Sequence, residues 1–158
     1  MFARYFVELA AAPAAVEAAL LEAPAAWMSG LAAEADDRGR RLLVDVGAGR
    51  ALHRVEKRVL VTAGAPVRMP SRTVVPLSWE ATGPGTLFPR MDADLELASL
   101  GPERTQLAIS ATYQPPFGPL GQMIDKALLH RLAEATVKDF LDRVGSTLER
   151  NALEQAAS

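Results

Sequence analysis

Five side chains carry cationic or phenolic groups at positions where apolar residues are expected: His53, Lys57, Tyr113, Lys126 and His130. The first two alternate with valines along one side of an expected strand, and the last two lie near the apolar side of an expected helix. Burying such a group among apolar side chains costs free energy unless a partner or a ligand compensates for it. The pattern therefore indicates either half-exposed side chains or the polar groups of a pocket that takes an acidic or phenolic ligand.

Tyr113 is the inward residue at the end of an expected strand, just before a segment rich in proline and glycine. In that position its hydroxyl reaches a cavity for which Trp79 forms an apolar wall; the alternative is an ordinary core tyrosine. Trp27 and Met28, on an expected short helix, either line the entrance of such a cavity or pack against the core. The sequence leaves both alternatives open.

Two further motifs are better explained by structure than by chemistry. The Gly-Ala-Gly segment 47–49 follows a strand, but Leu52 replaces the third glycine of a dinucleotide-binding loop, so a hairpin turn is expected. Asp92, Asp94 and Glu96 alternate along one strand face, which is typical of a solvated acidic edge. Because the chain has no cysteine, disulfides and thiolate chemistry are excluded. With two histidines in the chain, we expect no metal, and we expect no cofactor.

Alternating hydrophobicity predicts six strands. The expected strands cover residues 2–9, 42–46, 52–62, 73–81, 87–100 and 105–113. Residues 63–71 are expected to form a loop because they contain Gly64, Pro66 and Pro70. Two short helices are expected after the first strand, at 14–22 and from Pro24 to the Asp-Asp-Arg-Gly run at 36–39. The predicted order is strand, two helices, five strands, helix.

The last predicted helix is long and covers residues 119–149. After Ala135, the residues Val137, Phe140 and Val144 form a core-facing stripe opposite charged residues. Before Ala135, apolar residues occupy nearly every side of the helix. The first half is therefore expected to face a cavity as well as the sheet.

The composition is that of one globular domain, with 158 residues of which 49% are hydrophobic and 23% charged. We place this domain at residues 1–150, followed by a frayed tail at 151–158. The net charge of −2, with basic and acidic residues interleaved, argues against nucleic-acid binding. No apolar run is long enough for a signal peptide or for a membrane span of roughly 20 residues, so a cytoplasmic protein is expected.

Several segments together carry a family resemblance. They are Leu87-Phe88-Pro89, Asp92-Ala93-Asp94-Leu95-Glu96-Leu97, Tyr113-Gln114-Pro115-Pro116-Phe117-Gly118, Leu129-His130-Arg131, Ala135-Thr136 and Phe140-Leu141. With the predicted element order, they resemble an uncharacterised bacterial group of the START-like (SRPBCC) superfamily, which includes polyketide cyclases and lipid-transfer domains. The resemblance covers the whole chain and implies an α+β helix-grip fold, a curved antiparallel sheet of about six strands wrapped around a long C-terminal helix. It also implies a hydrophobic cavity between sheet and helix, closed at one end by the two short helices, but no shared catalytic motif.

Three functions follow as hypotheses. The first is binding of a small hydrophobic or amphipathic ligand in that cavity. The second is a polyketide cyclase-like or dehydratase-like enzyme in which Tyr113, His130 or His53 acts as acid or base. The third is a homodimeric module in which Ile124 and Leu128 form the contact face, which predicts an exposed patch and a filled core. The expected ligand-binding residues are Trp27, His53, Lys57, Leu77, Trp79, Met91, Ala93, Leu95, Ile109, Tyr113, Met123, Lys126 and His130.

Overall fold

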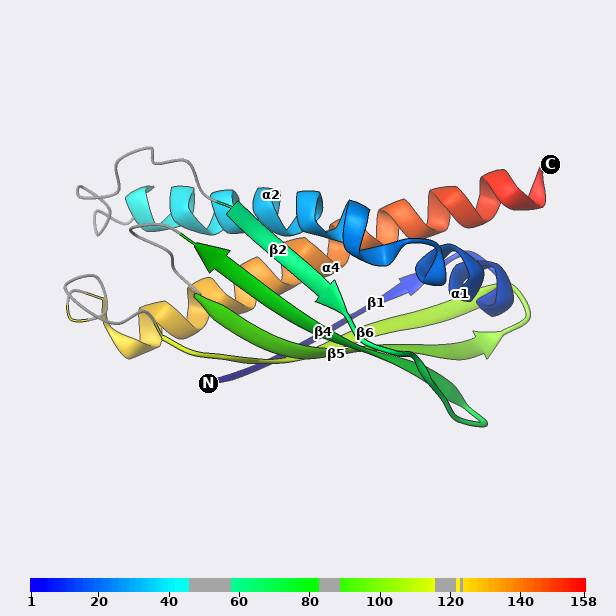
Figure 1. Cartoon of the computed structure of the whole chain (residues 1–158), viewed down its shortest axis with the longest axis horizontal. Helices are drawn as coiled ribbons and strands as arrows, with labels where there is room; N and C mark the ends of the chain where they lie inside the picture. The colour runs from blue at the N-terminus through cyan, green and yellow to red at the C-terminus, as the bar shows by residue number, and fades with distance from the viewer. Residues whose placement is uncertain (46–57, 83–88, 116–121, 123) are drawn as a thin grey trace.

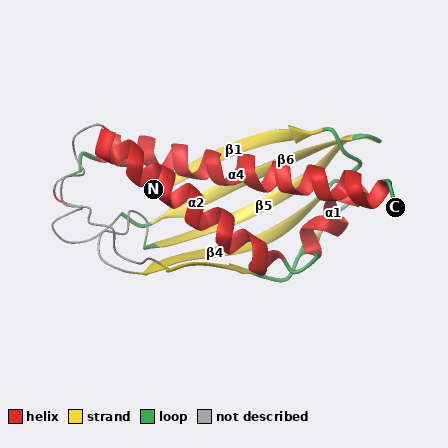
Figure 2. Ribbon diagram, turned by 90° about the horizontal axis from the view of Figure 1, so that it is seen from above, coloured by secondary structure: helices red, strands yellow, loops and turns green. Residues whose placement is uncertain are grey.

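A computed structural model describes residues 1–45, 58–82, 89–115, 122 and 124–158 (Figure 1). Its elements, in chain order, are β1 (Phe2–Leu9), α1 (Pro13–Leu21), α2 (Pro24–Asp45), β2 (Arg58–Ala63), β3 (Val67–Arg68), β4 (Arg72–Thr82), β5 (Arg90–Gly101), β6 (Arg104–Tyr113) and α4 (Lys126–Ala156). The strands form one antiparallel sheet in the order β1-β6-β5-β4-β2, with β3 paired to β4. The helices α2 and α4 cross the same face of this sheet, and α1 lies at one end (Figure 2). The predicted α+β helix-grip fold is confirmed.

The helix α2 is the largest departure from the sequence prediction. It runs for 22 residues to Asp45, so the strand predicted at 42–46 is wrong over the residues that the structure describes. Gly39, which we interpreted as a helix terminator, is buried inside the helix, where a residue without a side chain permits close packing. Met28, Ala32 and Ala35 form its buried face. The second helix is therefore a long neighbour of α4 and not a short cap.

The long helix α4 begins at Lys126 and not at Pro119. Asp125 is its N-cap, with an extended backbone and a carboxylate oxygen that accepts a hydrogen bond from the Ala127 N–H at 3.4 Å. At the other end, the residues after 150 continue the helix to Ala156, where we expected a frayed tail. Ala152 is buried there, so the last turns are tied to the core. Residues 119–121 lie outside the described part of the chain.

The helix α4 lies close against β1 at Gly145. A Cβ atom built on this residue would lie 3.1 Å from Val7 Cγ2 and 3.1 Å from Leu9 Cδ2, which is tighter than ordinary van der Waals contact. One turn further on, the Glu149 carboxylate accepts a hydrogen bond from the Ala10 N–H at 2.9 Å. These contacts fix the second half of α4 on β1. The core stripe predicted after Ala135 is confirmed, because Val137, Phe140 and Val144 are all buried.

The inner face of the sheet consists of cross-strand rows of alternating size. One row contains Val61, Trp79, Met91 and Tyr113, and the row next to it contains Ala63, Leu77, Ala93, Ala111 and Ala3. We call this second set the alanine row. A third row, with Val75, Leu95 and Ile109, is again bulky. The alanine row therefore leaves a depression, and Phe140 from α4 lies beside it, with its ring edge-on to Trp79 at a centroid distance of 5.4 Å.

Candidate functional site

Tyr113 and His130 meet where β6 ends and α4 begins. The Tyr113 hydroxyl lies 3.1 Å from His130 Nδ1, and His130 Nε2 lies 3.3 Å from a carboxylate oxygen of Glu134. Tyr113 is 1% exposed, whereas His130 is half-buried. Two of the polar residues singled out in the sequence are thus brought together. Glu134 was missed, although its spacing of four residues from His130 on one helix face was a usable signal.

The electrostatics of this trio keep the phenol neutral. Burial raises the pKa of Tyr113, and the negative charge of Glu134 raises that pKa further. When His130 Nε2–H donates to Glu134, Nδ1 is left as an acceptor for the Tyr113 O–H. The arrangement can therefore donate, accept or relay a proton at the edge of an otherwise apolar face.

A small void lies deeper between the sheet and α4. Its volume is about 10 Å³, and its lining is Val61, Leu77, Trp79, Met91, Ala93, Ile109 and Phe140. Five of these residues were among the ligand-binding residues expected from the sequence. Trp79 is 2% exposed, and its indole Nε1 has no hydrogen-bond partner within the described part of the chain. This part of the interior is thus almost filled, and the residue with the unpaired indole nitrogen is one of those that line the void.

The other expected site residues are spread more widely. Leu95 is fully buried in the same sheet face, and Lys126 is exposed on the first turn of α4. Trp27 is half-buried against the core, and its Nε1 donates to the Glu22 carbonyl at 3.3 Å. His53, Lys57 and Met123, together with the glycine segment 47–49, lie outside the described residues. Met28, for which we left two roles open, is fully buried and packs in the core.

The two residues assigned to a dimer face turn toward the core. Ile124 is buried, and Leu128 is half-buried and packs against the core cluster. An exposed patch built from these two residues is therefore not present.

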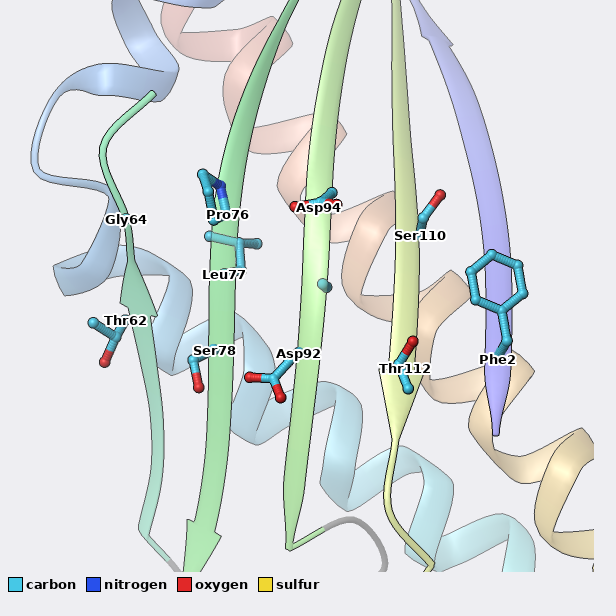
Figure 3. Close-up of a pocket in the computed structure, with 11 residues that line it drawn as sticks. Phe2, Thr62, Gly64, Pro76, Leu77, Ser78, Asp92, Asp94, Ser110 and Thr112 are labelled. Carbon is cyan, nitrogen blue, oxygen red and sulfur yellow. The ribbon is translucent and has the colours of Figure 1, made fainter. Parts of the chain in front are cut away.

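A larger hollow lies on the outer face of the sheet. It has a volume of about 500 Å³ and is lined by the side chains of two cross-strand rows (Figure 3). One row contains Thr62, Ser78, Asp92 and Thr112, the other contains Pro76, Asp94 and Ser110, and Phe2 lies on β1 at its side. This is the wet face predicted for β5. Within the described residues, no group of three His, Asp or Glu side chains lies close enough to hold a metal ion.

The element order and sheet topology define a helix-grip fold, in which a long C-terminal helix packs on a curved antiparallel sheet. A conserved protein from Geobacillus kaustophilus shares the fold with a TM-score of 0.54, at 14% identity, over 95% of this chain and 96% of that one. At that identity the likeness establishes the fold alone.

Two further solved structures are also similar over most of the chain. A START superfamily protein from Mycobacterium smegmatis gives a TM-score of 0.45 at 17% identity, over 90% of this chain and 96% of that one. Ara h 8.0201 gives a TM-score of 0.49 at 15% identity, over 98% of both chains. No model of a known family matches the sequence, and no curated protein matches it significantly. None of the described helices is long and apolar enough to cross a membrane.

Proposed function

We propose that this protein binds a small, mainly apolar molecule between the inner face of its sheet and α4, beside Tyr113 and His130. The observation that carries the proposal is the hydrogen bond of 3.1 Å between the buried Tyr113 hydroxyl and His130 Nδ1. Binding pockets for small molecules are mostly apolar, with a few convergent polar groups that orient the ligand. A phenol and an imidazole at the edge of an apolar sheet face have that composition.

Binding requires that the ligand displace side chains, because the void is too small to hold it. The void of about 10 Å³ is the size of one water molecule, whereas pockets for small organic molecules span about 300–1,000 Å³. Phe140 and Met91 are the side chains to displace, because both line the void and neither makes a polar contact that ties it down. Methionine adapts its shape readily, and the alanine row beneath offers a depression for a ring.

The polar end of the site suits a neutral hydroxyl group. Glu134 lies 3.3 Å from His130 Nε2 and offsets a positive charge on that imidazole. An ionised ligand would also lose its hydration among apolar side chains. We therefore favour a phenol or an alcohol over a carboxylate as the group that meets Tyr113.

Calorimetric titration with α-naphthol and with naphthalene, its hydroxyl-free counterpart, tests the proposal. The wild-type protein should bind both compounds and prefer α-naphthol by about fivefold, the usual net value of one hydrogen bond. Tyr113→Phe should remove that preference, whereas Tyr5→Phe, at the only other tyrosine, should keep it. If the wild-type protein binds neither compound up to its solubility limit, the proposal is wrong.

A second candidate function is acid–base catalysis of the polyketide cyclase type. The Tyr113–His130–Glu134 trio favours it, since a phenol oriented by an imidazole and a carboxylate can transfer a proton. Exchange of the α-hydrogens of α-tetralone for deuterium, followed by NMR, measures proton abstraction next to a carbonyl. Catalysis requires a faster exchange with the wild-type protein than with Tyr113→Phe. Equal rates would remove this candidate and leave the binding function in place.

A further inference from the structure

Two buried polar side chains near Phe140 have no hydrogen-bond partner among the residues that the structure describes. They are Trp79 Nε1, on the sheet, and Thr136 Oγ1, on α4 one turn before Phe140, in residues that are 2% and 1% exposed. Thr136 and Phe140 share a helix face because they are four residues apart. Buried groups of this kind are nearly always paired in folded proteins, since an unmade hydrogen bond in the interior costs free energy. Trp79 meets the Phe140 ring edge-on at a centroid distance of 5.4 Å, so the region around this ring is where a partner for its indole N–H would have to lie.

A trapped water is a poor partner for Trp79. The void has room for about one water molecule, but a buried water typically needs about three hydrogen bonds. Apart from the indole N–H, the side chains that line the void are aliphatic, aromatic or thioether groups. The missing partner is therefore better supplied by one oxygen atom on an otherwise apolar molecule.

We infer that the ligand of the proposed site carries a neutral carbonyl or ether oxygen, which accepts a hydrogen bond from Trp79 Nε1–H once the Phe140 ring has moved aside. The indole N–H is a donor only, so its partner must be an acceptor. An ionised carboxylate is disfavoured because the lining supplies no charge to balance it. This inference rests on the proposed binding function and adds the chemical class of the ligand.

One ligand can reach both polar points. Trp79, Met91 and Tyr113 are partners in a single cross-strand row, so Trp79 and Tyr113 lie two strands apart. At roughly 4.8 Å per strand, their Cα atoms are about 10 Å apart. A ligand that contacts both residues would therefore lie across Met91, which stands between them in the row.

The test compares α-tetralone with tetralin, which has the same two rings without the carbonyl. Nitrogen-15 spectra of the wild-type protein show the indole N–H signals of Trp27 and Trp79, and Trp27→Phe assigns them. α-Tetralone should move the Trp79 signal downfield and bind about fivefold more tightly than tetralin, as one hydrogen bond predicts. Tetralin should bind without moving that signal downfield. If both compounds bind equally and the Trp79 signal stays in place, the inference is wrong and the binding function stands.

A variant separates this inference from the binding function. Phe140→Ala enlarges the void beside Trp79, so both compounds can enter without any opening of the native core. If the wild-type protein binds neither compound but Phe140→Ala prefers α-tetralone with the same downfield shift, the Trp79 N–H can donate to a carbonyl, but the binding function fails and the inference about its ligand fails with it. Equal binding of both compounds by Phe140→Ala overturns the role of Trp79. Trp79→Phe, checked for folding by circular dichroism, should lower the affinity for α-tetralone by about fivefold and leave tetralin unchanged.

Discussion

The two faces of the central sheet have opposite kinds of hollow. The outer hollow of about 500 Å³ is open and lined by hydroxyls and carboxylates together with apolar groups such as Phe2 and Pro76, whereas the inner void of about 10 Å³ is lined by buried apolar side chains. Polar groups on the exposed outer face can hydrogen-bond to solvent, whereas a trapped water is a poor partner for Trp79 on the inner face. The difference teaches that volume alone does not locate a binding site. We base the proposed site on the small apolar void beside an unpaired donor and not on the larger hollow.

Removing the ring of Phe140 is the strongest way to test this contrast. Phe140→Ala should lower the free energy of unfolding by about 3–5 kcal/mol, because a fully buried ring leaves a cavity behind. Leu153→Ala, at an exposed position of the same helix, should change it by less than about 0.5 kcal/mol. Urea unfolding measures both values. A loss below about 1 kcal/mol for Phe140→Ala would mean that this ring does not fill the inner face.

Enlarging neighbouring residues on β6 tests the two faces side by side. Ala111→Leu should cost about 1–3 kcal/mol, because the alanine row is covered and an added side chain overpacks it. Thr112 is exposed on the outer face, so Thr112→Leu should lower the free energy of unfolding by less than about 0.5 kcal/mol. Thermal unfolding of the two variants measures the difference. Equal costs would contradict a filled inner face and an open outer one.

The buried phenol predicts a pH dependence. Because the pKa of Tyr113 is raised in the folded state, its contribution to stability is present below the unfolded pKa of about 10 and is lost as the pH rises through the higher folded pKa. The free energy of unfolding of the wild-type protein should therefore fall more steeply above pH 10 than that of Tyr113→Phe. Urea titrations across this alkaline range measure the two slopes. Parallel curves would show that the phenol titrates alike in both states.

A substitution on the outer face of the sheet should change the free energy of unfolding least. Asp92→Asn removes an ion pair with Arg90, whose atoms lie 3.3 Å apart with both side chains more than half exposed. Exposed pairs of this kind are worth little, so the expected loss is below about 0.5 kcal/mol and should shrink further in high salt. Thermal unfolding at low and high salt checks this. A larger and salt-independent loss would give the outer hollow a structural role that its exposure does not predict.

The sequence predicted side-chain burial best where a single hydrophobic periodicity runs through a strand or a stretch of helix. The alternation along β5 placed Met91, Ala93 and Leu95 inward, and the stripe after Ala135 placed Phe140 in the core, because these elements each bury a single face. The length of α2 was missed because Gly39 is a helix terminator by local preference. Its burial against neighbouring elements overrides that preference.

The candidate site was only partly predictable for a different reason. Tyr113 and His130 were each named from one-dimensional patterns, but their contact of 3.1 Å joins residues 17 positions apart on two elements. The alanine row depends on the register between strands, which no single strand encodes. The unpaired state of Trp79 Nε1 is a property of everything packed around it and has no signal in the sequence.

The tight contact at Gly145 has a mechanical consequence for the first half of α4. A rigid helix held at that point would swing like a lever, with Phe140 about 7.5 Å and His130 about 22 Å from the pivot at 1.5 Å per residue. A displacement of about 1 Å at Phe140 would thus become about 3 Å at His130. The space between α4 and the sheet would therefore widen most at the end where Tyr113 lies. The contacts of Gly145 with Val7 and Leu9 would stay in place.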